Sequence, residues 1–455
     1  MSKHLKILLV VALALMVGAP AMAMKFDFHG DFNNRFLLYT DQAGFFGSRV
    51  LDKDDRPDTF GEIKYRLWTT ASTDDGAVKG VFAVEVGAVK YGTAGVGRQQ
   101  GGSFSGDATS VETRWFYTDF QIPSIASKAR VQMGLLPHTV NKFFWAETAM
   151  GVKFYGDNWY LAWIRPKSDF PTTGGTTDNK DWGDNELDTI NARYDLKMEP
   201  VKVGVFVTYM WENTNATSVT FDPASANEVR LFPTSNFDLL TVGIDGGWST
   251  ATSFGKAFVN WDLLYQTGGI DDVTTTGNNF DIQGYLLHGD FGLTFGKATV
   301  TYTVYYASGD DSSTDKDIDN FFHVDVDLFD SFIFQESLTD DNVFFEGAYV
   351  LDKGIFFNKL ALDYAVSKKA KLGIAGLYLM TAEDLTLANG SKENALGIEI
   401  DAYGTYKLYD NVELRLNLAY LIADDAMDFF ETAATQNGSS DVDIFKSEAR
   451  VRFQF

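Results

Sequence analysis

Hydrophobic and polar residues alternate one by one along much of this 455-residue chain. The clearest run has apolar side chains at every second position: Val412, Leu414, Leu416, Leu418, Tyr420 and Ile422. Successive side chains of a β-strand point to opposite faces, so such a segment has one apolar and one polar face. The alternating segments run for about ten residues or more, which is the length of a tilted strand that crosses a bilayer and exceeds the usual length of strands in soluble sheets. The pattern therefore predicts an all-β fold, a transmembrane antiparallel up-and-down β-barrel.

The connections between these segments are of two kinds, which alternate along the chain. Short ones carry turn-forming residues, as in Asp74-Asp75-Gly76, Glu199-Pro200 and Asp410-Asn411. Long polar ones occupy residues 41–58, 93–109, 171–185, 216–236, 270–279, 311–356, 385–394 and 428–440. Outer-membrane barrels have short periplasmic turns and long extracellular loops, so this asymmetry favours a barrel over a soluble sandwich.

Eighteen strands satisfy both patterns. We expect them at residues 25–40, 59–73, 78–92, 110–123, 129–140, 150–158, 159–170, 186–199, 201–215, 237–251, 254–269, 278–296, 297–310, 357–368, 369–384, 395–410, 411–427 and 441–455. An even number brings both termini to the periplasmic side. Sixteen and twenty strands are the alternatives, because the fourth to seventh strands are the least regular and residues 321–326 and 342–351 offer a further hairpin.

The N-terminal segment has the pattern of a secretory signal peptide. Lys3, His4 and Lys6 precede an apolar stretch at residues 7–17, and Ala21-Met22-Ala23 is a small-x-small cleavage site. We therefore expect residues 1–23 to be removed on export. The mature chain, residues 24–455, is then a single barrel domain in the bacterial outer membrane, in contact with lipid and lipopolysaccharide.

The C-terminal segment carries an independent signal. From Ala449 onward every second residue is apolar, and the chain ends on Phe455. This ending resembles the terminal-strand signal of outer-membrane barrels, and the resemblance implies that the barrel-insertion machinery recognises the strand through Phe455.

Composition excludes several other classes of protein. The chain has no cysteine, which rules out disulfides, thiolate metal sites and thiol nucleophiles, and its net charge of -24 argues against a nucleic-acid partner. We find no motif for a catalytic metal, a nucleophilic serine or a phosphate loop, and expect no cofactor, no metal and no enzymatic activity. His288 beside Asp290 is the local acid–base candidate, and an inward polar pair is its simpler interpretation.

The charged residues between the apolar positions are expected to face the lumen. A charge on the lipid face would cost about 2–4 kcal/mol at the midplane. We therefore predict the following pore-lining residues: Arg35, Arg66, Arg193, Glu399, Asp401, Glu413, Arg415, Arg450 and Arg452. Arginines on the wall attract anions, and facing carboxylates set up a transverse field. Paired charges that only keep the lumen hydrated are the alternative.

One segment carries a family resemblance. Tyr305-Tyr306-Ala307-Ser308-Gly309-Asp310, followed by Asp315 and Phe321-Phe322, resembles the tyrosine-rich strand and loop entry of the alginate-export family of outer-membrane barrels. The resemblance implies an eighteen-stranded monomeric barrel with an arginine-lined, anion-selective lumen. Inward acids such as Glu399 dilute that lining. The chain also resembles general porins, which are sixteen-stranded homotrimers narrowed by a long third loop, but here the third connection, residues 141–149, is short and aromatic.

Together these patterns predict a porin. We expect a passive, water-filled diffusion channel for small hydrophilic or anionic solutes, either a monomer or a homotrimer. A barrel-type enzyme and a surface adhesin are the alternatives, and the adhesin would use residues 311–356 to bind its partner.

Overall fold

The computed structural model describes residues 24–40, 42–43, 50–51, 58–94, 101–103, 109, 111–123, 128–167, 186–213, 236–273, 278–312, 315–326, 328–335, 349–350, 352–431 and 442–455. The expected signal peptide, residues 1–23, lies outside the described residues. Within them, no helix is long and apolar enough to cross a membrane.

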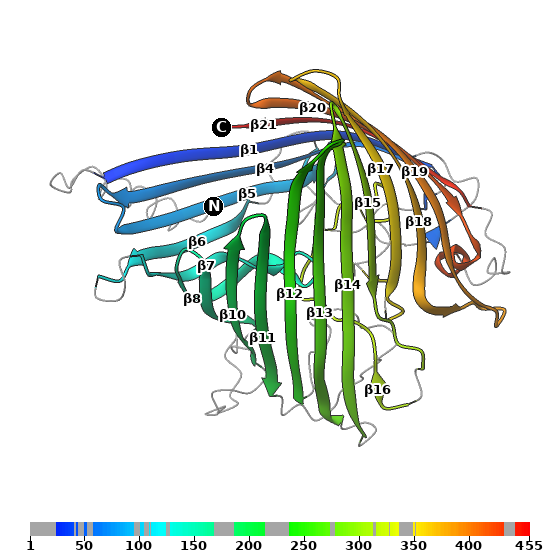
Figure 1. Cartoon of the computed structure of the whole chain (residues 1–455), viewed down its shortest axis with the longest axis horizontal. Coiled ribbons are helices and arrows are strands. Elements are labelled where there is room, and N and C mark those ends of the chain that lie inside the picture. The colour runs from blue at the N-terminus through cyan, green and yellow to red at the C-terminus, as the bar shows by residue number, and fades with distance from the viewer. Residues whose placement is uncertain are drawn as a thin grey trace.

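Eighteen antiparallel strands form one closed barrel. In chain order they are β1 (Met24–Tyr39), β4 (Asp58–Thr73), β5 (Val78–Lys90), β6 (Val111–Gln121), β7 (Arg130–Asn141), β8 (Trp145–Tyr155), β9 (Trp159–Lys167), β10 (Glu186–Met198), β11 (Val201–Asn213), β12 (Asn236–Thr252), β13 (Gly255–Val273), β14 (Asn278–Phe295), β15 (Ala298–Ala307), β17 (Ile355–Ala365), β18 (Ala370–Thr386), β19 (Lys392–Tyr409), β20 (Val412–Ala423) and β21 (Ile444–Gln454). Figure 1 shows how the strand direction turns gradually from β1 round to β14.

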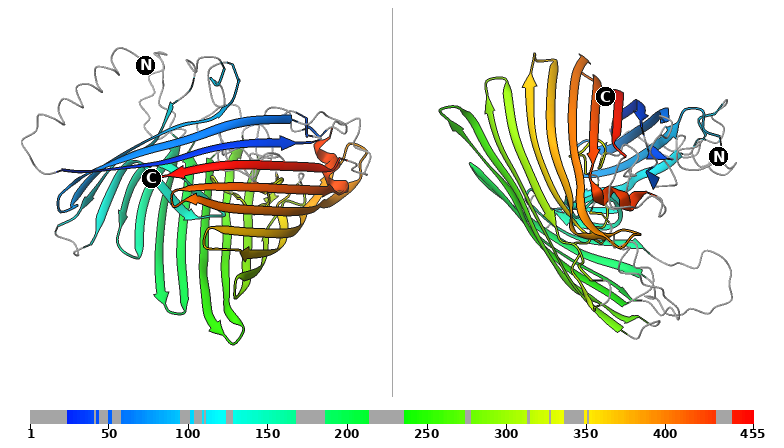
Figure 2. Two further views of the ribbon diagram at one scale, coloured as in Figure 1. Left: turned by 90° about the horizontal axis from the view of Figure 1, so that it is seen from above. Right: turned by 90° about the vertical axis from the view of Figure 1, so that its right-hand side faces the viewer.

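The ring closes between its first and last strands. Each barrel strand pairs with the next one along the chain, and β1 pairs with β21 as well as with β4. Both views in Figure 2 show the blue first strand and the red last strand next to each other. Every strand of the ring therefore has a hydrogen-bonded neighbour on both sides, as a membrane-spanning sheet requires.

Among the described residues, four short elements lie outside this ring. β2 (Gln42–Ala43) and β3 (Val50–Leu51) pair with each other, and the 3-10 helix η3 (Asp425–Phe430) follows β20. β16 (Asp317–Ile318) pairs in parallel with β14 beyond the end of β15. It thus extends the wall for two residues before the chain turns inward.

The two faces of each strand differ as the alternation predicts. On β20, Leu416 is 51% exposed whereas the next residue, Asn417, is 1% exposed. On β19, Ile398 and Ile400 are exposed on either side of Glu399, which is buried. In a closed barrel the exposed apolar face is the outer one, so the buried polar face surrounds the lumen.

The predicted count of eighteen strands is confirmed, and most strand limits agree within a few residues. β8 is the main exception, because it begins at Trp145 rather than at residue 150. The hairpin with β7 continues up to the pair Asn141 and Trp145. The polar pair Glu147-Thr148 hid this extension, although Glu147 simply takes an inward position opposite His138.

The described part of the connection from β15 to β17, which spans residues 308–354 apart from 313–314, 327, 336–348 and 351, folds largely into the barrel. The proposed extra hairpin at 321–326 is wrong, because these residues form no barrel strand and instead pack against the inner wall, where Phe321 and Phe322 are fully buried. Most of residues 342–351 lie outside the described residues. Gly284 of β14 permits the close approach, since a Cβ there would lie 2.8 Å from the carbonyl oxygen of Asn320.

Candidate functional site in the barrel lumen

All nine charged residues predicted to line the pore lie on the inner face of the wall. Each alternates with an outward apolar residue, as Arg35 does with Phe36 and Arg193 with Tyr194. The others are Arg66, Glu399, Asp401, Glu413, Arg415, Arg450 and Arg452. They are not equally accessible, because Arg35, Glu399 and Asp401 are buried. The rest are only partly buried.

Three arginines lie side by side next to the seam where the barrel closes. In the strand register Arg450 of β21 is opposite both Arg415 of β20 and Arg35 of β1. Arg35 forms ion pairs with Glu62 of β4 and with Glu448 of β21. Arg35 thus ties the first strand to both of its neighbours, whereas Arg415 and Arg450 add positive charge to the same level of the wall.

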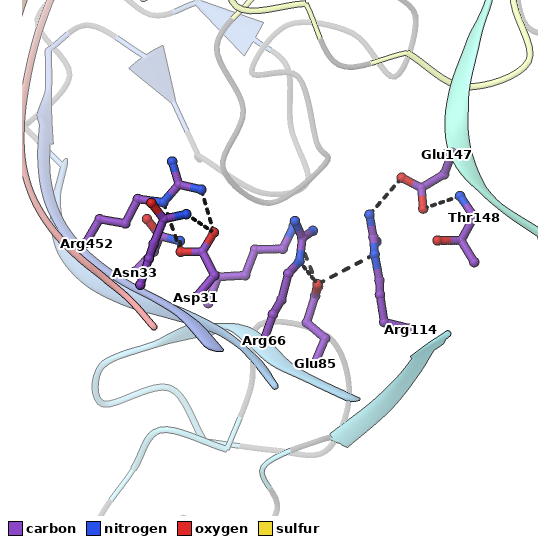
Figure 3. Close-up of polar contacts among 10 residues, drawn as sticks. Asp31, Asn33, Arg66, Glu85, Arg114, Glu147, Thr148 and Arg452 are labelled. Atoms are coloured by element: carbon purple, nitrogen blue, oxygen red, sulfur yellow. Dashed lines mark hydrogen bonds and ion pairs between the residues drawn. The ribbon is translucent and has the colours of Figure 1, made fainter. Parts of the chain in front are cut away.

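A series of ion pairs continues along the inner wall from this seam (Figure 3). The pairs are Arg452 with Asp31, Arg66 with Glu85, Arg114 with Glu85, and Arg114 with Glu147. Arg452 Nε donates to Asp31 Oδ1 at 2.9 Å, and Arg114 Nη2 to Glu147 Oε2 at 3.0 Å. The side chains of Arg66 and Arg452 keep 32% and 36% of their surface exposed. These guanidinium groups therefore remain accessible to an ion in the lumen.

The inward loop, the described part of residues 308–354, is fixed to β19 through Glu399. Glu399 Oε1 accepts the backbone N–H groups of Phe332 and Ile333 at 2.7 and 3.0 Å, and its Oε2 accepts the Ser331 hydroxyl at 2.6 Å. The Phe332 ring also lies 5.2 Å from the guanidinium carbon of Arg415. This carboxylate is therefore a loop anchor, and the loop covers it.

Lysines of two other strands hold the same part of the loop. Lys446 of β21 donates to the carbonyl of Phe332, and Lys359 of β17 donates to the carbonyl of Asp330. Gln335 of the loop donates to the Tyr305 hydroxyl of β15. Residues 330–335 are thus bound to side chains of β15, β17, β19 and β21.

The short turn between β7 and β8, residues 142–144, also enters the lumen. Asn141 Nδ2 donates to Asp262 Oδ1 at 2.5 Å and to Asp245 Oδ2 at 3.2 Å, so the turn reaches β12 and β13. The Phe143 ring lies 4.7 Å from the ring of His288 and 5.3 Å from that of Tyr305, measured between centroids. The turn therefore meets strands that are distant from it around the ring.

This turn and the inward loop also bind each other. The backbone N–H of Val324 donates to the carbonyl of Phe144 at 2.8 Å, and the N–H of Ala146 donates to the carbonyl of Asp325 at 2.9 Å. The Tyr349 hydroxyl donates to the carbonyl of Phe143 at 2.5 Å. Together the turn and the loop form a lumen insert, which we define as residues 142–144, 320–326 and 328–335.

An acidic row lies beneath the turn on β10 to β14. Asp195, Asp245, Asp262 and His288 are successive inward residues of one register level, with Gly204 between the first two. Arg193 donates to Asp245 Oδ2 at 2.6 Å and also pairs with Asp195. Arg193 is therefore held within its own ion-pair cluster rather than in line with the seam arginines.

His288 does not have the geometry of a catalytic base. Its Nδ1 lies 2.7 Å from Asp262 Oδ2 and its Nε2 lies 3.3 Å from Asp290 Oδ1, so both ring nitrogens face carboxylates. The Phe143 ring covers its side chain, which is 1% exposed. Among the described residues, no group of three or more His, Asp or Glu side chains is placed to hold a metal ion.

The base of the inward loop contains a buried carboxyl group outside the membrane-spanning strands. Burial raises the pKa of Asp310 to about 6, with Lys353 opposing the shift and Asp352 and Asp315 adding to it. Lys353 Nζ donates to the carbonyl of Asp310 at 2.6 Å. The loop base therefore contains a group that titrates within one unit or so of neutral pH.

Sequence reasoning missed several inward residues of this site. Glu85 and Asp262 occupy regular inward positions in β5 and β13, so the alternation itself could have identified them. Arg114 and Glu147 lie in the irregular fourth and sixth strands of the ring, where the pattern was weak. Lys142 lies in a turn, where no alternation exists to place it.

Comparisons with known proteins give a fold but no sequence family. No protein-family model matches the sequence, and no curated protein matches it. Similar solved structures exist, and they include OccK9 (OpdG) of Pseudomonas aeruginosa, with a TM-score of 0.55 and 11% identity over 95% of this chain and 98% of that chain.

Two further similar structures were solved with small molecules. Pseudomonas aeruginosa OpdK with vanillate has a TM-score of 0.53 and 12% identity, covering 94% of this chain and 98% of that chain. OccK2 (OpdF) of the same organism in complex with glucuronate has a TM-score of 0.51 and 11% identity, covering 95% and 96%. At such low identity the likeness concerns the backbone alone, and this chain, with eighteen strands, shares the barrel fold of these outer-membrane proteins.

Proposed function

We propose that this protein is a passive diffusion channel of the bacterial outer membrane, selective for small anionic solutes. The observation that carries the proposal is the row of Arg415, Arg450 and Arg35 on adjacent strands of the inner wall. Like charges directly opposite each other in a sheet are unfavourable. Arg35 pairs with Glu62 and Glu448, and the three neighbouring guanidinium groups concentrate positive charge on one level of the wall, which attracts anions from the lumen.

Carboxylates are the class of anion that suits this wall best. A guanidinium group presents parallel N–H donors that match the two oxygens of a carboxylate. Vanillate and glucuronate, named with two of the similar structures, are both carboxylates. We therefore propose small organic carboxylates as natural solutes, with Arg66, Arg415, Arg450 and Arg452 as contacts. Glu413, opposite Arg452 in the register, moderates the local charge.

The observations favour a channel over the alternatives. His288 has carboxylates at both ring nitrogens, which leaves neither for a serine nucleophile. The described parts of residues 308–354 are largely buried inside the barrel, so they do not form an adhesive surface. The match to the alginate-export family stays a prediction. The eighteen strands and the arginine row support it, whereas the acidic row on β10 to β14 does not.

The cellular setting forms part of the proposal. We propose that residues 1–23 are a cleaved signal peptide and that residues 24–455 form the mature channel, surrounded by lipid and lipopolysaccharide. Phe455 is proposed as the residue that the insertion machinery recognises, and its ring packs beside that of Phe453. Both a monomer and a homotrimer are compatible with this barrel.

Ion selectivity tests the proposed function. The refolded protein in a planar bilayer under a KCl gradient is expected to give a stable conductance whose reversal potential shows anion preference. In the double variant Arg415→Gln, Arg450→Gln the chloride-to-potassium permeability ratio should fall about thirtyfold, because each of the two lost charges acts on a nearby ion with about 1 kcal/mol.

Arg165→Gln is the matched control. Arg165 lies two residues after the outward Trp163 on β9, so it also faces outward, where it pairs with Asp188. The substitution therefore removes a positive charge that lies away from the lumen. Its permeability ratio should equal that of the unmodified protein. A wild-type channel that prefers cations, or one that conducts no ions, would contradict the proposed function.

A further inference from the structure

One exposed cation stands on the lumen insert. Lys142 is the middle of three consecutive residues, and its side chain is exposed while its neighbours Asn141 and Phe143 are buried. Its Nζ lies 4.4 Å from the centroid of the Phe143 ring. That ring packs against His288 and Tyr305 on the inner face of β14 and β15. The ammonium group is therefore inside the barrel and in contact with water.

The backbone that carries this ammonium is held on both sides. Asn141 is bound to Asp262 and Asp245, and Arg193 Nη1 donates to the carbonyl of Val140 at 3.1 Å. On the other side the carbonyls of Phe143 and Phe144 accept hydrogen bonds from the inward loop. The turn is thus fixed in place, and only the Lys142 side chain extends from it.

The carboxylates around the turn already have hydrogen-bond partners. Asp245 accepts from Arg193, Asp262 accepts from Asn141 and faces His288, and the Thr303 hydroxyl donates to Asp290. Lys142, by contrast, contacts the Phe143 ring and forms neither a hydrogen bond nor an ion pair with the residues that the structure describes. Its charge is therefore free to act on an ion in the lumen.

We propose that Lys142 is a selectivity-determining residue of the channel, which draws small carboxylates past the lumen insert. This inference rests on the proposed channel function and assigns part of its anion selectivity to the turn rather than to the seam. An unpaired charge in a confined passage with low-dielectric walls acts strongly on a passing ion. The ammonium offsets the acidic row below it, which would otherwise repel a carboxylate from this side of the lumen.

Charge substitution at this position tests the inference. In a planar bilayer under a KCl gradient, Lys142→Gln should lower the chloride-to-potassium permeability ratio about fivefold, the factor that corresponds to about 1 kcal/mol. Lys142→Glu should lower it further, and Lys142→Arg should leave it unchanged. Flux of sodium gluconate into protein-containing vesicles should fall in the same order. Lys368→Gln is the matched control, since Lys368 is exposed on the turn between β17 and β18.

The absence of cysteine allows the charge to be changed in the assembled channel. Lys142→Cys provides a single thiol, and a positively charged methanethiosulfonate reagent should restore anion preference, whereas a negatively charged one should reverse it. Because the same folded molecules are measured before and after labelling, a folding defect cannot produce this pair of results.

The outcomes separate the inference from the function on which it rests. If the wild type conducts with anion preference and Lys142→Glu has the same permeability ratio, the inference about Lys142 is wrong and the channel function stands. If the wild type gives no conductance, the channel function and the inference both fail.

Discussion

Arg35 lies at the point where the first strand meets both of its neighbours, and its side chain is 3% exposed. A guanidinium group so far from water needs partners of opposite charge, and Glu62 and Glu448 supply them from the strands on either side. The sequence predicted that Arg35 faces inward. It did not predict its partners, because Glu448 is 413 residues away along the chain.

Removal of Arg35 should destabilise the barrel. Arg35→Met leaves two buried carboxylates without their shared cation, for which we expect a loss of about 3–5 kcal/mol in the free energy of unfolding. Urea titration of the protein in lipid vesicles, followed by tryptophan fluorescence, measures this loss. Lys128→Met is the control, since its pair with Asp157 is exposed and its removal should change little. Equal stability of both variants would show that the buried pairs contribute nothing.

Asp310 should make the loop base sensitive to pH. Its pKa is raised to about 6 by burial, so the folded loop binds a proton more readily than the unfolded chain does, and acidification stabilises the folded form. Hydrogen exchange of residues 308–312, corrected for the intrinsic rate, should therefore slow as the pH falls from 7.5 to about 5. In Asp310→Asn the corrected rate should be slow at both values. A pH effect that persists in this variant would assign the titration to another group.

At the scale of elements, the path of the inward loop is the feature that the sequence did not predict. The polarity and length of residues 311–356 left two possibilities open, an external loop and a segment that folds inward to plug or gate the lumen. Phe321, Phe322, Phe332 and Phe334 were the available signal, because an external loop rarely needs so many aromatic side chains. The contacts of the loop with β14, β19 and β21 depend on the curvature of the closed barrel, and no local sequence pattern encodes that curvature.

The anchor at Glu399 should control how firmly this loop is held. In Glu399→Gln the remaining side-chain oxygen still accepts hydrogen bonds, but the NH2 group that replaces the other oxygen cannot accept one from the Ser331 hydroxyl. The side chain also loses the negative charge that strengthens its hydrogen bonds with the backbone N–H groups. We expect larger and noisier single-channel conductance as the loop leaves the wall. Glu393→Gln on the same strand is the control. A quiet Glu399→Gln channel of unchanged conductance would show that the loop is held without this anchor.

At the scale of the whole molecule, the sequence predicted the architecture well. Strand number, the two faces and the alternation of short and long connections all follow from local period-two patterning, which a barrel repeats around its ring. The same alternation predicts that the nine selected charged residues point away from the apolar face of their strands. The turn and loop that fill the lumen could not be predicted in this way, because contacts such as that of Glu399 with Phe332 join segments that share no local pattern.

The pairing of β1 with β21 has a consequence for how the chain is ordered. The backbone N–H of Gly30 donates to the carbonyl of Phe455, so the first and last barrel strands are neighbours in the finished wall. In such a closed ring every strand has two hydrogen-bonded neighbours, so the first strand has no special position in the wall. The wall is a continuous ring of strands, and the order of the strands in the sequence is only one of the orders in which the ring could be traced.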